Sequence, residues 1–308
     1  IIKHGELQYI FIEPGDSIMF RLNTVGFDES LAFSGRGAEK NNFLMNLFLQ
    51  NEEEDKRLPE LYKLNPKAFE KEISHSKKAL LRELDEFIIS EKPSESFIHI
   101  ALSNINYNYY SRKELYLSSK KVASSHKQIL YPEHFFTYRD SVQLNDNTLK
   151  NYYTYYQFIN RYLDNLADDG HKKQKTFFNK TSYEHQTQKL RLIDSLITNK
   201  QLHDNLLHNT VKRYLVHADD SQKEHDLVAL FKKLDHNEAH QKEVERYAHN
   251  TAKINAGELI PNLALITANN EITSLQKINA SKTVFFFWNS KSVKHYKEIH
   301  VRIADLKT

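Results

Sequence analysis

Between residues 38 and 254, apolar residues recur every three or four positions, which is the spacing of one buried helix face. The clearest helix begins at Asn65 and Pro66, since Asn is a favoured N-cap and Pro a favoured first residue. Three apolar faces follow: Phe69, Ile73, Leu80, Leu84, Phe87 and Ile88; Leu149, Tyr152, Tyr153, Tyr156, Ile159, Leu163 and Leu166; and Leu202, Leu206, Leu207, Val211, Tyr214 and Leu215. These segments share no fixed period, so we predict an irregular helical domain over residues 38–254, not a solenoid.

Residues 1–37 have the pattern of short β-strands. Leu7, Tyr9 and Phe11 alternate with their neighbours, and a turn signal at residues 13–16 leads into a second alternating run at residues 17–22. A last strand is expected before the glycines at 35 and 37. Within the helical region, Ser221 and Glu224 predict a capping box for one more helix.

Near the end of the sequence, an apolar run at residues 285–288 closes on Trp288, and Ser292 and His295 follow. This arrangement resembles the active-site strand and turn of the thioredoxin family, in its TlpA/ResA branch. The family's Cys-x-x-Cys pair falls on Ser292 and His295 of this chain. Residues 257–263, 264–266, 272–275 and 281–284 are similar to the strands leading into that motif, and Glu298 matches a Glu common in the branch. His300 departs from the family, which often has Pro there.

The resemblance implies that residues 255–308 are the N-terminal part of a thioredoxin-like domain. Residues 1–37 are in turn similar to a small β-sandwich that precedes thioredoxin modules in envelope lipoproteins of Bacteroidota, on the strings at 14–18, 33–35 and 41–44. The expected fold class is therefore α+β and multidomain: a β-sandwich remnant (1–37), a helical domain (38–254) and the start of a thioredoxin-like domain (255–308). We expect further chain on both sides of this sequence.

The chain contains no Cys, which excludes disulfides, thiolate catalysis and cysteine metal sites. A serine hydroxyl cannot perform thiol exchange and an imidazole cannot close a disulfide, so Ser292 and His295 predict lost redox activity and no catalytic residues. The resemblance implies a structural role for Trp288 and a protein-binding surface at Lys291, Lys294 and Tyr296. No cofactor is expected.

The net charge is +3, from 43 basic and 40 acidic residues, and this near balance does not favour nucleic acid as a partner. The longest apolar run, residues 283–288, is shorter than the ~20 residues of a membrane-spanning helix. The resemblance implies the periplasm, on an outer-membrane-anchored lipoprotein whose lipid anchor lies in a segment before Ile1.

Histidines are frequent between residues 203 and 249, and His236 and His240 share a helix face. Glu238 stands two residues after His236, which does not fit the His-Glu-x-x-His zinc pattern, so we expect no metal site. Among the tyrosines, Tyr152, Tyr153 and Tyr156 are predicted to be core residues, whereas Tyr109 and Tyr155 are the candidates for a surface contact.

These observations predict a redox-inactive, non-catalytic envelope protein that acts as a protein-binding or scaffold subunit, including as part of an outer-membrane complex. Two alternatives remain. The first is a thiol-disulfide oxidoreductase of the TlpA/ResA type, which would need cysteines elsewhere. The second is a glycan-binding module, which would need an exposed aromatic platform.

Overall fold

The computed structural model describes residues 2–3, 6–23, 26–123, 129–169, 179–218, 220–251, 262–278 and 283. The chain divides into two compact units, Ile1–Ala252 and Lys253–Thr308. The fold is mainly helical, and the described strands pair only in small two-stranded sheets. None of the described helices is both long and apolar enough to span a bilayer.

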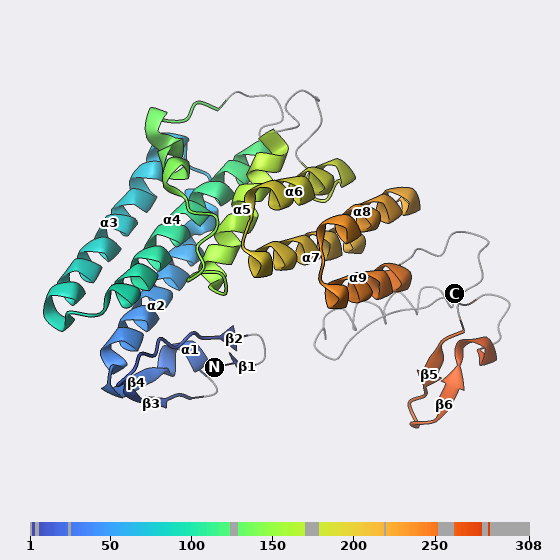
Figure 1. The fold of residues 1–308 in the computed structure, drawn as a ribbon, viewed down its shortest axis with the longest axis horizontal. Coiled ribbons are helices and arrows are strands. Elements are labelled where there is room, and N and C mark those ends of the chain that lie inside the picture. Colours follow the sequence, from blue (N-terminus) through green and yellow to red (C-terminus); the bar gives the residue numbers. More distant parts are fainter. Residues whose placement is uncertain are drawn as a thin grey trace, which may run out of the picture. The chain divides into compact units, whose positions relative to one another are not determined.

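The first unit begins with two antiparallel strand pairs (Figure 1). Strand β1 (Ile2–Lys3) pairs with β2 (Glu6–Leu7), and β3 (Ser17–Arg21) pairs with β4 (Ala32–Arg36) around the short helix α1 (Phe27–Ser30). The predicted turn before β3 is present: the amide of Asp16 donates to the Glu13 carbonyl over 3.0 Å.

The predicted strand through Phe11 is wrong, because β2 ends at Leu7. The backbone of Phe11 pairs instead with the side chain of Asn41: its amide donates to Asn41 Oδ1 (2.7 Å), and its carbonyl accepts from Asn41 Nδ2 (2.8 Å). One side-chain amide thus takes the place of a neighbouring strand.

Two glycines allow the β3–β4 hairpin to close onto the helices. Gly35 and Gly37 have φ angles of 93° and 88°. A Cβ at Gly35 would lie 2.2 Å from the carbonyl oxygen of Ser17, and one at Gly37 would lie 2.2 Å from Asp16 Oδ1. Neither position accepts a side chain without displacing the turn or strand beside it.

Nine longer helical segments follow in the described part of this unit: α2 (Ala38–Leu61), α3 (Pro66–Glu91), α4 (Glu95–Ala123), the 3-10 segment η1 (Glu133–Ser141), α5 (Tyr153–Asp169), α6 (Tyr183–Leu196), α7 (Lys200–His217), α8 (Ser221–Leu234) and α9 (Glu238–Thr251). Helices α2, α3 and α4 contact one another and lie side by side (Figure 1). Helix α5 packs against α4 and α6, and α7 packs against α6, α8 and α9.

Side-chain caps fix several of these helix starts. Asn65 caps α3 as predicted, its Oδ1 accepting from the Ala68 amide at 2.9 Å. The predicted capping box of Ser221 and Glu224 is wrong, because the helix is capped one residue earlier. The N-cap of α8 is Asp220, because its carboxylate accepts from the amides of both Gln222 and Lys223.

The predicted face of α7 is confirmed, since all six of its residues are buried. In α3, Phe69, Ile73, Leu80 and Leu84 are buried as predicted, whereas Phe87 and Ile88 are only partly buried. The predicted face of α5 is partly wrong. Tyr155 is fully buried, whereas Tyr153 is exposed. The predicted positions Ile159 and Leu163 are buried further along the helix, so the error is confined to its first turn, which begins at Tyr153.

In the second unit, β5 (Ala264–Ile266) pairs antiparallel with β6 (Ile272–Ser274), and the 3-10 turn η2 (Leu275–Lys277) follows. Both strands lie at positions where the sequence predicts them. The predicted active-site strand and helix of the thioredoxin-like domain lie outside the described residues.

Candidate functional site

The residues that the sequence singles out near its end are not part of the described structure. Outside the described residues lie Trp288, Lys291, Ser292, Lys294, His295 and Tyr296. The site that the described residues offer is in the first unit, and sequence reasoning did not identify it.

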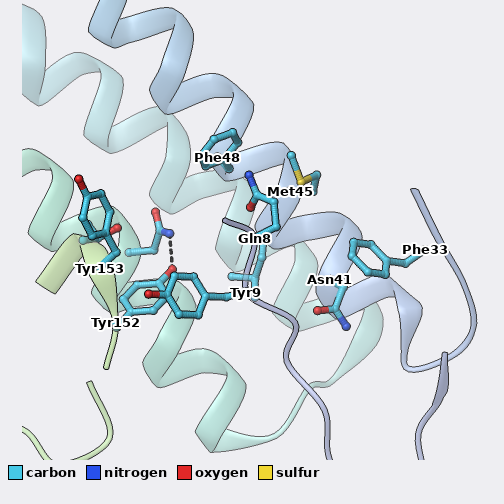
Figure 2. Close-up of a pocket in the computed structure, with 11 residues that line it drawn as sticks. Gln8, Tyr9, Phe33, Asn41, Met45, Phe48, Tyr152 and Tyr153 are labelled. Atoms are coloured by element: carbon cyan, nitrogen blue, oxygen red, sulfur yellow. Dashed lines mark hydrogen bonds between the residues drawn. The ribbon is translucent and has the colours of Figure 1, made fainter. Parts of the chain in front are cut away.

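This site is a pocket of about 100 Å³ between the segment after β2, helix α2, helix α4 and the start of α5 (Figure 2). Its walls are aromatic rings, aliphatic side chains and amides: Gln8, Tyr9, Phe33, Asn41, Leu44, Met45, Phe48, Asn104, Tyr152, Tyr153 and Thr154. The lining residues come from segments far apart in the sequence.

The N-terminal wall is positioned by buried amides. Asn41, only 2% exposed, holds Phe11 through the two hydrogen bonds described above. Gln8 Nε2 donates to Asp28 Oδ1 at 2.7 Å, which ties the same segment to α1. The phenol of Tyr9 donates to the carbonyl of Asn151 at 2.9 Å, just before α5.

Two tyrosines pack against each other at the α5 side of the pocket. The rings of Tyr9 and Tyr152 are 5.3 Å apart at an angle of 54° (Figure 2). Asn104 Nδ2 donates to the Tyr152 hydroxyl at 2.6 Å, the hydrogen bond drawn in Figure 2. Burial raises the pKa of Tyr152 to about 12, so this phenol stays neutral at physiological pH. Tyr153 borders the pocket with 56% of its surface exposed.

The lining has no carboxylate, lysine, arginine or histidine among the described residues. General acid–base catalysis works best with a group whose pKa lies near the working pH, and neither the amides of this lining nor Tyr152, whose pKa burial raises, fits that range. Pockets for drug-sized ligands measure roughly 300–1,000 Å³. A pocket of about 100 Å³ with aromatic walls instead matches a single apolar side chain.

The tyrosine predictions are corrected by this geometry. Tyr155 is buried, and its hydroxyl donates to the Gln143 carbonyl at 2.7 Å. Tyr109 is half-buried and donates to Glu70 at 2.6 Å, so it belongs to the α3–α4 interface. Tyr153, predicted to be core, is the exposed ring. A single tyrosine in the first turn of a helix gives no periodic signal, so the apolar pattern could not indicate that Tyr153 is exposed.

The histidines take part in helix packing. His240 Nδ1 lies 3.1 Å from Asp235 Oδ2, and its ring stacks on His208 with centroids 4.3 Å apart. Within the described ranges, no three His, Asp or Glu side chains are placed to hold one metal ion.

Buried charges form a second kind of feature that the sequence did not reveal. Glu114 on α4 is completely buried and accepts from Arg139 Nε at 3.0 Å, Arg139 Nη2 at 2.8 Å, the Tyr138 hydroxyl at 2.5 Å and Asn165 Nδ2 at 2.6 Å. This network joins α4 to η1 and α5. Since its donors and acceptors are matched, we interpret it as a structural element.

Comparison with protein-family models, with curated proteins and with solved structures finds no match for this chain. The description of this chain therefore rests on its own structure: it is a mainly helical protein with a pocket whose walls are neutral and largely aromatic.

Proposed function

We propose that this chain is a non-catalytic protein-binding subunit, and that the pocket beside Tyr153 receives an apolar side chain of its partner. The observation that carries the proposal is the pocket's lining, which combines neutral aromatic walls with a volume suited to one side chain. Tyrosine is enriched at protein interfaces because it offers a large contact area at low cost in conformational entropy.

The absence of Cys from the sequence supports the non-catalytic part of the proposal. On the thioredoxin resemblance, Ser292 and His295 replace the redox pair, and the domain serves as a binding fold. The same resemblance supports a periplasmic location on a lipid-anchored protein of the outer membrane, within a larger complex. It also offers a second interface, at Lys291, Lys294 and Tyr296.

A glycan-binding role has less support. Carbohydrate rings stack on flat aromatic faces, but Tyr9 is tilted by 54° against Tyr152 and the two do not form a common plane. Of the pocket's aromatic side chains, Tyr153 alone exceeds half exposure among the described residues.

Photo-crosslinking tests the proposal. The intact protein would carry p-benzoylphenylalanine at position 153 in its native cells, and the same group at Ile89 as a control, because Ile89 is 76% exposed on α3. We expect a protein adduct from position 153 and none from position 89. Replacing Thr154 with Trp should fill the pocket and remove the adduct, while circular dichroism shows that the helices are retained.

A third crosslinking position, Lys291, separates the two interfaces. An adduct at 291 with none at 153 would move the binding surface to the thioredoxin-like region and overturn the assignment of the pocket. An adduct at 153 that persists with Trp at 154 would also contradict it, because the partner would then contact Tyr153 without entering the pocket.

A further inference from the structure

The hairpin of β3 and β4, beside the start of α2 (Figure 1), has one closed edge and one open edge among the described residues. The outer edge of β4 is closed by a side chain. The Phe33 amide donates to Asn42 Oδ1 (2.9 Å), and the Phe33 carbonyl accepts from Asn42 Nδ2 (2.9 Å). Asn42 therefore does for β4 what Asn41 does for the backbone of Phe11. No described residue does the same for β3.

The backbone groups at the open edge follow from the register. Phe33 lies opposite Phe20, and Ser34 lies opposite Met19. In an antiparallel pair, the amide and carbonyl of two facing residues point either toward each other or away from each other. Since those of Phe33 point to Asn42, those of Phe20 point outward from β3. Neither the amide nor the carbonyl of Phe20 has a hydrogen bond to a described residue.

This edge lacks the devices by which soluble proteins prevent strand pairing, which include Pro, bulges and inward-pointing charges. Strand β3 contains no Pro, and its five residues pair with β4 without interruption. Its single charged residue, Arg21, stands at its end. The apolar side chains of Met19 and Phe20 are 68% and 52% exposed. An open edge with exposed apolar side chains indicates a site for another strand.

The solvent face of the hairpin sets the charge of a strand that fits there. By strand alternation, six exposed residues form this face: Ser17, Met19, Arg21, Ala32, Ser34 and Arg36. The face thus carries two arginines and no carboxylate. The pKa of Asp16, in the turn before β3, is lowered by Lys40 at 2.9 Å and more weakly by Arg36. Arg21 makes no ion pair with any described residue, so it is the charge available to a partner.

The length of the edge favours a peptide over a second folded copy of the chain. Five residues of β-strand span about 17 Å. Stable interfaces between folded proteins bury roughly 1,200–2,000 Å², far more than one such edge supplies. Recognition of an extended peptide by strand addition needs only a short edge, because main-chain hydrogen bonds provide the affinity and alternate side chains the specificity.

We propose that the open edge of β3 binds an extended peptide segment of a partner protein as an added strand. The main chain of the segment bonds to the outward amide and carbonyl of Phe20. Two consecutive apolar residues of the segment cover Met19 and Phe20 on the two faces of the hairpin, and a neighbouring Asp or Glu meets Arg21. This surface is distinct from the pocket beside Tyr153, and the proposal does not depend on that pocket.

Peptide selection on the full chain tests the surface. Random peptides displayed on phage are selected against the wild type, and the enriched sequences are synthesised as probes. We expect these probes to contain two consecutive apolar residues beside an Asp or Glu. In amide exchange followed by NMR, they should slow exchange of the outward Phe20 amide at least tenfold and leave the Met19 amide, which faces Ser34, unchanged. If no enriched probe protects the Phe20 amide, the proposal is wrong.

Two substitutions at one position isolate the backbone donor. Phe20→Val removes the ring and keeps the amide, whereas Phe20→Pro removes both. The Pro variant should bind the probe at least tenfold more weakly than the Val variant, which is about 1.4 kcal/mol. Equal affinity of the two variants would overturn the proposal, because the peptide would then not use the strand edge. If the Pro variant does not fold, protection of the Phe20 amide in the wild type still decides.

The full chain without peptide distinguishes the other possible occupants. Light scattering should show a monomer, and its Phe20 amide should exchange rapidly. A dimer that protects this amide would identify a second copy as the occupant. Protection in the monomer would identify another segment of the same chain. Either result would overturn the assignment of the edge to a partner's peptide.

Discussion

Replacing Glu114 with Ala should destabilise the helical unit more than any exposed charge substitution. The carboxylate is completely buried, and its removal leaves the Arg139 guanidinium, whose side chain is 16% exposed, without its negative partner. Breaking a buried ion pair from one side costs about 3–5 kcal/mol. For a unit of this size, each kcal/mol lowers the melting temperature by about 2–4 °C, so the expected shift is about 6–20 °C.

The matched control is Glu53→Ala. Glu53 also pairs with a basic residue, Lys56, but their side chains are 73% and 61% exposed, and such surface pairs contribute about 0–1 kcal/mol. Urea unfolding followed by circular dichroism at 222 nm measures both variants, because the helices lie in the unit that contains both residues. The reasoning would be refuted if Glu114→Ala and Glu53→Ala lost similar stability.

A second variant separates the buried charge from the packing. Glu114→Leu combined with Arg139→Leu removes both charges, so it should be more stable than Glu114→Ala despite changing more atoms. If the double variant is the less stable of the two, then the cost of Glu114→Ala comes from lost packing and not from an uncompensated guanidinium.

Further expectations concern redox activity, Trp288, the lysines beside it and pH. Insulin reduction with dithiothreitol should match the buffer blank, since the chain has no Cys; turnover above blank would contradict the loss of redox chemistry. Trp288→Ala in the complete domain should lower the free energy of unfolding by about 3–5 kcal/mol, measured by thermal melting. A melting temperature within a degree or two of the wild type would mean that Trp288 is exposed. Lys291→Glu with Lys294→Glu should slow partner association most at low salt, measured by pull-down from native membranes; unchanged recovery of every partner would place the interface in residues 38–254. Asp164→Asn should make the protein lose less stability as the pH falls. Burial alone would raise the pKa of Asp164, but Lys189, with His185 and Lys180, holds that pKa below its usual value. That stability is present above the unfolded pKa of about 3.9 and is lost as pH falls below it. An unchanged acid limb in urea titrations between pH 5 and 2 would contradict this.

The helices were predictable where each buries one periodic stripe of apolar side chains, even where, as in α3, that stripe meets two separate core clusters. The faces of α3 and α7 are periodic because each helix buries a single stripe, and Asn65–Pro66 marks a start by local chemistry alone. The start of α5 was not predictable in this way. Leu149 and Tyr152 pack against the same core from outside the helix and so extend the apparent period.

The sites depend on contacts between distant positions, which a single sequence does not specify. Arg139 meets Glu114 across 25 positions, and Asn41 meets Phe11 across 30. Neither pair has a local pattern, because the spacing is set by helix packing and not by helix repeat. The basic side chains around Asp164 likewise come from other parts of the chain, although each looks like an ordinary surface charge in the sequence.

The contacts around the pocket join positions far apart in the sequence, and this affects how the chain folds. Tyr9 reaches the carbonyl of Asn151 over 142 positions, and Ser94 reaches Glu13 over 81. Long loops must close before such contacts form, so they add to contact order and slow folding. During synthesis, the pocket cannot exist until residue 154 has left the ribosome, although α2 and α3 are complete long before. Its formation therefore requires residues 151 and 152, and a chain truncated before residue 151 would leave Tyr9 without the Asn151 carbonyl and Asn104 without the Tyr152 hydroxyl.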